Sequence, residues 1–282
     1  MKSTAHGNGI FSGFLLISDM DLTLTNDSGA ISDRNADAIL HYQAEGGLFT
    51  VASGRYPSYI LNVPGRAKPN TYVIGINGTE LYDPKTGETV YSCVLEDHAD
   101  IRSIICDMAE LCETLTHIVF STYRKEETIS RAELTDRHAL HARLDALEET
   151  YPVWHRLIFV QNAEHTADNM QVLHKLCGDR YALDRSWSEG IELHAKGSGK
   201  GALVPEMKRL LAEGGTPIHT VVCAGDYEND LSMFQTADIA YAVGNAIPLL
   251  KAAADRITVS YREDAIAHII ADLEAECGEA LF

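Results

Sequence analysis

The sequence lacks the features that mark membrane, secreted and nucleic-acid-binding proteins. None of its apolar runs approaches the about 20 residues that a membrane-spanning helix needs, so no membrane partner is expected. Its six cysteines include no Cys-x-x-Cys pair, which predicts reduced thiols in a cytoplasmic protein. Lys and Arg number only 23 against 41 Asp and Glu, a formal net charge of −18. Such a chain is not expected to bind nucleic acid, although a small phosphorylated ligand needs only a local positive pocket.

The composition is otherwise that of a folded protein of ordinary type. Hydrophobic residues make up 45% of the chain and charged residues 23%, which is typical of globular rather than disordered sequences. At 282 residues the chain is too long for one small core and is expected to form two domains.

Short apolar runs without alternation predict strands that are buried on both faces of a parallel sheet. Helical patterns separate them, and this order of strand, helix and strand predicts an α/β fold with a doubly wound, Rossmann-like parallel sheet. The expected strands cover residues 14–17, 48–52, 72–76, 221–224 and 239–243. We therefore expect residues 1–82 and 191–282 to form one discontinuous domain.

The middle of the chain has a different pattern. A hairpin is expected over 81–91, and helices and strands then alternate in shorter segments. This pattern predicts an inserted α/β cap domain over residues 83–190. Its expected helices cover about 97–112, 135–148 and 166–177, and its expected strands include 117–122, 156–161 and 181–184. A short strand over 191–194 is expected to close it at the boundary.

Polar side chains follow the buried strands of the larger domain. In open α/β sheets ligands bind beyond the carboxyl ends of the strands, so these side chains are expected to converge on one crevice. They are Asp19, Asp21, Ser53, Asn77 and Asp226. One carboxylate can attack a phosphoryl group, and a neighbouring carboxyl can protonate the leaving oxygen and then activate water.

Charge balance predicts a metal ion in this crevice. Asp19, Asp21 and Asp226 carry three negative charges, and a phosphate monoester dianion adds two more. One Mg²⁺, which prefers oxygen ligands, and one lysine would offset most of that charge. The lysine is expected within residues 196–201. Residues 194–201 depart from the phosphate-binding P-loop pattern at His194 and Gly201.

Taken together, these residues resemble the haloacid dehalogenase-like hydrolases, specifically the Cof-type phosphatases with a type IIB cap. The resemblance covers nearly the whole chain, and the insertion lies between the second and third motifs, as in that branch. The four motifs, in order, are Asp19-Met20-Asp21-Leu22-Thr23, Val51-Ala52-Ser53-Gly54-Arg55, Lys200-Gly201 and Gly225-Asp226-Tyr227-Glu228-Asn229-Asp230. Ile76-Asn77-Gly78 and Val243-Gly244-Asn245-Ala246 match lesser signatures of the family.

The resemblance implies roles for individual residues. Asp19 would be the nucleophile and Asp21 the general acid and base. Mg²⁺ would be bound by the Asp19 carboxylate, the Asp21 backbone carbonyl and the Asp226 carboxylate, with Asp230 in the same metal site. The residues expected to hold the phosphoryl group or the substrate are Thr23, Ser53, Gly54, Arg55, Asn77, Lys200 and Asn229.

One position departs from the family pattern. The residue before the motif's threonine is usually glycine, and here it is Leu22. We expect this side chain to pack against the cap or the core, because otherwise Thr23 would be displaced.

The sequence thus predicts a Mg²⁺-dependent phosphatase of small phosphorylated metabolites, with sugar phosphates as the favoured class and an aspartyl-phosphate intermediate. Two alternatives stay open: a phosphotransferase or mutase that passes the phosphoryl group to a hydroxyl, and a non-catalytic metabolite-binding module. Four charged residues of the motifs, Asp19, Asp21, Lys200 and Asp226, argue against the second. Monomer and homodimer are both compatible with the sequence.

Overall fold

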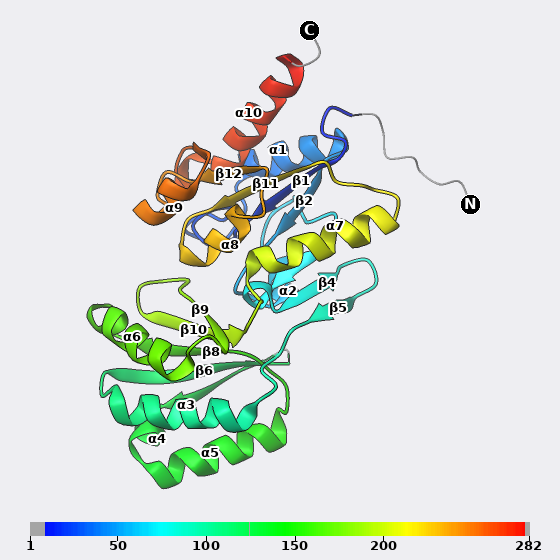
Figure 1. Cartoon of the computed structure of the whole chain (residues 1–282). Helices are drawn as coiled ribbons and strands as arrows, with labels where there is room; N and C mark the ends of the chain where they lie inside the picture. The colour runs from blue at the N-terminus through cyan, green and yellow to red at the C-terminus, as the bar shows by residue number, and fades with distance from the viewer. Residues whose placement is uncertain (1–8, 124, 280–282) are drawn as a thin grey trace. The chain divides into compact units, whose positions relative to one another are not determined.

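The computed structural model describes residues 9–123 and 125–279 of the chain. The chain divides into two compact units, one formed by residues 1–91 and 199–282 and the other by residues 92–198. Figure 1 shows the elements of both. Among the described residues, no helix is long and apolar enough to cross a membrane.

A five-stranded parallel sheet forms the centre of the discontinuous unit, with the strand order β13-β12-β11-β1-β2. The first strand of the chain lies inside this order, so β1 pairs with β2 on one side and with β11 on the other. The strands are β1 (Phe14–Ser18), β2 (Leu48–Val51), β11 (Thr220–Gly225), β12 (Ile239–Ala242) and β13 (Arg256–Ile257).

Helices cover both faces of this sheet, because successive residues of each strand point to opposite faces. Leu16 of β1 packs in one core with side chains of α1 (Asp33–Ala44) and α10 (Ala265–Glu279). Leu15 and Ile17 pack in a second core with α7 (Val204–Glu213), α8 (Leu231–Phe234) and α9 (Pro248–Ala253). The expected doubly wound α/β sheet is confirmed.

The third expected strand lies elsewhere. β3 (Val73–Gly75) pairs antiparallel with β4 (Glu80–Asp83), and β5 (Glu88–Ser92) completes a separate three-stranded sheet. A single parallel bridge between Ala52 and Ile74 joins it to the end of β2. The short helix α2 (Pro57–Leu61) precedes β3, and the 3₁₀ turn η1 (Ile76–Gly78) follows it.

The second unit is an antiparallel sheet with its helices packed on an apolar core. The strand order is β7-β6-β8-β10-β9. Its strands are β6 (Leu115–Thr122), β7 (Glu126–Ser130), β8 (Trp154–Gln161), β9 (Tyr181–Asp184) and β10 (Gly190–Ala195). Its helices are α3 (His98–Leu111), α4 (Arg131–Thr135), α5 (Arg137–Thr150), η2 (Ala163–His165) and α6 (Thr166–Cys177).

The boundaries of the compact units fall later in the chain than the sequence suggested. The unit boundary follows residue 91 rather than 82, because β5 belongs to the same sheet as β3 and β4. It falls after residue 198 rather than 190, because β10 pairs with both β8 and β9. Strand pairing therefore places the hairpin of β4 and β5 in the discontinuous unit and β10 in the inserted unit.

Candidate active site

Asp19 comes directly after β1, at the carboxyl edge of the parallel sheet. Its backbone N–H donates to the carbonyl of Ala224 at 2.8 Å, so the pairing with β11 continues one residue past the strand. Only 9% of its side chain is exposed. The strand ladder therefore fixes the position of a nearly buried carboxylate.

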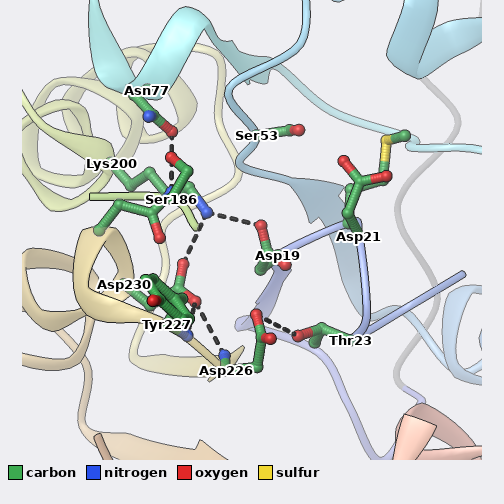
Figure 2. Close-up of polar contacts among 12 residues, drawn as sticks. Asp19, Asp21, Thr23, Ser53, Asn77, Ser186, Lys200, Asp226, Tyr227 and Asp230 are labelled. Atoms are coloured by element: carbon green, nitrogen blue, oxygen red, sulfur yellow. Dashed lines mark hydrogen bonds and ion pairs between the residues drawn. The ribbon is translucent and has the colours of Figure 1, made fainter. Parts of the chain in front are cut away.

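Lys200 provides the positive charge beside it. Its Nζ lies 2.6 Å from Asp19 Oδ1 and 2.6 Å from Asp230 Oδ1, and its side chain is buried. Figure 2 shows the ammonium group between these two carboxylates. Lys200 begins the 3₁₀ turn η3 (Lys200–Leu203), after Gly199 at a φ of 138°.

Close packing of backbone holds this turn in place. A Cβ atom on Gly78 would lie 2.0 Å from the carbonyl oxygen of Gly199, and one on Gly201 would lie 1.9 Å from that of Ser232. Only glycine permits such approaches. The glycine after Lys200 in the third motif is thus explained by backbone contact rather than by phosphate binding.

Asp226 and Asp230 extend from the loop after β11 and the 3₁₀ turn η4 (Glu228–Asp230). Asp230 Oδ2 accepts the backbone N–H groups of Asp226 at 2.9 Å and Tyr227 at 3.2 Å. Its other oxygen accepts from Lys200. Asp230 therefore shapes the Asp226 loop and fixes Lys200, with both oxygens engaged.

Three carboxylates and one lysine leave this cluster with an excess of negative charge. Burial raises the pKa of Asp19 to about 7, with Lys200 opposing the rise and Asp230 adding to it. Burial and the charges of Asp19 and Asp230 raise the pKa of Asp226 to about 8. Burial opposes the charge of Lys200, but the two carboxylates beside it outweigh this effect and raise its pKa.

The cluster has the composition of a divalent cation site. Asp19, Asp226 and Asp230 each offer a carboxylate oxygen, and these oxygens lie within 4.8 Å of one another. Hard oxygen donors with uncompensated negative charge suit Mg²⁺. Burial, followed by the charges of neighbouring carboxylates, raises the pKa values of Asp19 and Asp226, and a bound cation would oppose both effects. The residues present therefore fit the expected ion.

Asp21 lies outside this buried cluster. Its side chain is half exposed, and its Oδ2 accepts from Arg55 Nε at 3.1 Å. The Arg55 guanidinium in turn lies over the ring of Tyr59, 4.9 Å from its centroid. Among the described residues, the group of acidic side chains close enough to share an ion does not include the Asp21 carboxylate.

The Leu22 side chain is not part of the core of its own unit. It is 49% exposed, and the residue has a φ of 61°, in the left-handed region. Thr23 is nevertheless fully buried, and its hydroxyl donates to Asp226 Oδ1 at 3.5 Å. A left-handed backbone at Leu22 turns the chain as a glycine would, and Thr23 keeps its buried position beside Asp226.

The remaining expected residues lie at the end of β2 and beside η1. The Asn77 N–H donates to the Ser53 carbonyl at 2.9 Å, and the Ser53 hydroxyl accepts the Arg55 N–H at 3.2 Å. Asn229 Nδ2 donates to Asn77 Oδ1 at 3.1 Å. The structure thus links the loops of the second and fourth motifs through a pair of buried asparagines.

Sequence reasoning missed Asn245 as a member of the site. Its side-chain amide donates to the backbone carbonyl of Leu22 at 2.9 Å. The only signal was the lesser signature Val243-Gly244-Asn245-Ala246, which carries no chemical indication of that contact.

Comparison with known proteins assigns the chain to a family. The model of the haloacid dehalogenase-like hydrolases matches residues 16–270. The 5-amino-6-(5-phospho-D-ribitylamino)uracil phosphatase YcsE of Bacillus subtilis is 26% identical over 91% of this chain and 94% of that protein. The phosphatase YwpJ of the same organism is 23% identical over 92% of this chain and 99% of that protein.

Solved structures share the fold. A haloacid dehalogenase-like hydrolase from B. subtilis superposes with a TM-score of 0.72 at 21% identity, covering 91% of this chain and 98% of that one. The subclass IIB sugar phosphatase BT4131 superposes with a TM-score of 0.70 at 20% identity, covering 92% and 98%. The protein belongs to the haloacid dehalogenase-like hydrolase family, as the order of its motifs indicated.

Proposed function

We propose that the protein is a Mg²⁺-dependent phosphatase of small phosphorylated metabolites that works through an aspartyl-phosphate on Asp19. The observation that carries the proposal is the buried Asp19 carboxylate, held 2.6 Å from Lys200 in a cluster with Asp226 and Asp230. Family membership and the names of the phosphatase relatives support the same reaction class.

In the proposed first step, an Asp19 carboxylate oxygen forms a bond to phosphorus while the bond from phosphorus to the ester oxygen breaks. Asp21 gives that departing oxygen a proton. In the second step water attacks the phosphoryl group, its proton passes to Asp21, and the Asp19 carboxylate is released. Such assistance is needed because phosphate monoesters are among the slowest esters to hydrolyse unaided.

The other site residues position the phosphoryl group. Lys200 holds the attacking carboxylate and supplies positive charge, and Thr23 and Ser53 supply hydroxyl groups beside it. Asp19, Asp226 and Asp230, with the Asp21 backbone carbonyl, would hold Mg²⁺, which supplies charge neutralisation for the transferring phosphoryl group when bound. Gly54, Arg55, Asn77 and Asn229 complete the proposed phosphate and substrate contacts.

The ion pair between Arg55 and Asp21 affects the mechanism. Arg55 Nε donates to Asp21 Oδ2 at 3.1 Å. An ionised, ion-paired carboxylate cannot donate a proton, so Asp21 must be protonated and freed from Arg55 before the leaving oxygen departs. Because both side chains are half exposed, breaking this pair costs at most about 1 kcal/mol.

For the substrate we propose sugar phosphates and related polyol phosphates. The support is that two relatives from Bacillus subtilis, YcsE and YwtE (25% identical), are 5-amino-6-(5-phospho-D-ribitylamino)uracil phosphatases, and that the sugar phosphatase BT4131 shares the fold. We assign selection of the substrate to the inserted cap, the unit of residues 92–198. We place the enzyme in the cytoplasm, in keeping with six cysteines that are all free.

The test is release of inorganic phosphate by the purified full-length chain from a panel of sugar, polyol and nucleoside phosphates, with Mg²⁺ or with a chelator. Asp19→Asn keeps the shape of the side chain and is expected to reduce turnover to background while leaving the fold intact. Isomerised sugar phosphate without free phosphate would indicate a mutase instead. Full activity of Asp19→Asn would contradict the proposal.

A further inference from the structure

Leu22 has a backbone conformation that its side chain disfavours. A φ of 61° brings the Cβ atom of an L-residue close to its own carbonyl, which costs free energy in every residue except glycine. With 49% of the residue exposed, packing of the side chain within its own unit does not account for the conformation. Contacts of the backbone must therefore stabilise it.

The side chain of Asn245 makes such a contact. Its Nδ2 donates to the Leu22 carbonyl at 2.9 Å, and its Oδ1 accepts the backbone N–H of Tyr261 at 3.2 Å. Because one partner is an acceptor and the other a donor, the two bonds fix the orientation of the amide. Asn245 therefore bridges two backbone segments that are far apart in the sequence.

The backbone next to Asn245 is held in place by hydrogen bonds of its own. The N–H of the preceding residue, Gly244, donates to the Val259 carbonyl at 3.0 Å, and its carbonyl accepts from Lys251 Nζ at 2.6 Å. The backbone that carries Asn245 is thus tied to neighbouring structure. The Asn245 side-chain amide therefore donates to the Leu22 carbonyl from a backbone segment whose position is fixed.

The same region contacts the loop after β1 a second time. Asp27 accepts from the Tyr261 hydroxyl and, at 3.0 Å, from Arg262 Nε. Within the loop, the Met20 carbonyl accepts the backbone N–H groups of residues 24 and 25, which closes a tight turn with Leu22 at its apex. The conformation of residues 20–27 is thus set from outside as well as within.

We propose that Asn245 is a positioning residue that holds Leu22 in the left-handed conformation. This conformation places Thr23 beside Asp226 and leaves Asp21 half exposed. The inference rests on the proposed function for the roles of Asp21 and Thr23. Asn245 itself touches no reacting atom and acts through the backbone of residue 22.

A double-mutant cycle between positions 245 and 22 tests this. Asn245→Ala is expected to lower kcat about 10- to 100-fold with a much smaller change in KM, because the loop then samples inactive conformations. Leu22→Gly, which adopts a φ near 60° without strain, is expected to stay active. In the Leu22→Gly background, Asn245→Ala is expected to lower kcat less than about threefold.

Asn70→Ala is the matched control. Asn70 also donates to a backbone carbonyl, that of Gly47 at 3.1 Å, and accepts a backbone N–H, that of Phe49 at 2.8 Å. These contacts lie at the start of β2, so loss of the Asn70 side chain is expected to lower the urea midpoint without changing kcat. Leu22→Gly is expected to leave the effect of Asn70→Ala unaltered.

Urea unfolding of the same variants tests the inference without an activity measurement, so it can fail or succeed independently of the proposed function. Even if the wild type hydrolyses no substrate of the panel, Asn245→Ala must lower the midpoint more in the wild-type background than in the Leu22→Gly background. Equal losses in both backgrounds overturn the inference. Wild-type kcat in Asn245→Ala, or a loss that Leu22→Gly does not restore, overturns it as well.

Discussion

Asp226→Asn is expected to stabilise the metal-free protein while abolishing catalysis. Asp226 is 8% exposed, and its pKa is raised from 3.8 to about 8 by burial and by Asp19 and Asp230. A carboxyl with a raised folded-state pKa binds its proton more tightly in the native state than in the unfolded state. Its contribution to stability is therefore lost as the pH rises from about 4 to about 8.

The size of this effect follows from the shift. Four pKa units correspond to about 5 kcal/mol in the free energy of unfolding at pH 8. Asparagine has nearly the same shape and stays neutral, and its carbonyl oxygen can still accept from Thr23. We expect Asp226→Asn to exceed the wild type by several kcal/mol at pH 8 without metal, and to match it below pH 4.

The assay is urea unfolding of both proteins at pH 4, 6 and 8 in the presence of a chelator. Asp238→Asn would be an unsuitable control because that carboxylate accepts a backbone N–H. Asp107→Asn, on α3 of the other unit, changes the net charge equally. A stability difference that does not grow with pH, or a variant less stable than the wild type at pH 8, would refute the electrostatic reasoning.

Two further predictions concern the same charges. Lys200→Met leaves the buried carboxylates of Asp19 and Asp230 without their cation, so we expect it to lower the free energy of unfolding by about 3–5 kcal/mol at pH 8. The control Lys208→Met on α7 should lower it by under about 1 kcal/mol. Equal losses for the two variants in chemical denaturation would contradict the assignment. Mg²⁺ should raise the thermal midpoint more at pH 8 than at pH 5, because protons compete with the ion for Asp19 and Asp226, whose pKa values are about 7 and 8. Differential scanning fluorimetry measures both midpoints, and a shift that is independent of pH would count against a carboxylate site.

Much of the fold followed from local sequence patterns. Buried strands made mainly of apolar residues, such as Phe14–Ser18, signal a parallel sheet, and the polar residues at the end of each one mark its carboxyl edge. That rule suffices to bring Asp19 and Asp226 together. The contacts of Lys200 with the carboxylates of Asp19 and Asp230 also agree with the expected charge balance.

The unpredicted parts depend on pairing between distant segments. β3 has the apolar composition of a central strand, yet it joins β4 and β5 because a hairpin partner follows it directly. β7 (Glu126–Ser130) was missed because a charged edge strand lacks a buried pattern. The unit boundaries moved for the same reason, since β10 is assigned by its partners β8 and β9.

Leu22 shows a different limit of sequence reasoning. A leucine gives no local indication of a left-handed φ, and its contact with Asn245, more than 200 residues later in the chain, accounts for it. The Arg55 ion pair with Asp21 was equally invisible, because residue spacing does not specify which way an exposed side chain turns. Pattern reasoning therefore anticipated that Asp19, Asp226 and Lys200 lie close together, but not the contacts that orient Leu22 and Asp21.

The central claim is that Asp19 carries the phosphoryl group during turnover. Acid quenching of the full-length enzyme during steady-state hydrolysis, followed by peptide mass spectrometry, tests it directly. We predict a phosphorylated peptide containing Asp19 that is labile to hydroxylamine and is absent from Asp19→Asn. Rapid turnover with no phosphoryl group on this peptide, or a group that persists in Asp19→Asn, would contradict the account.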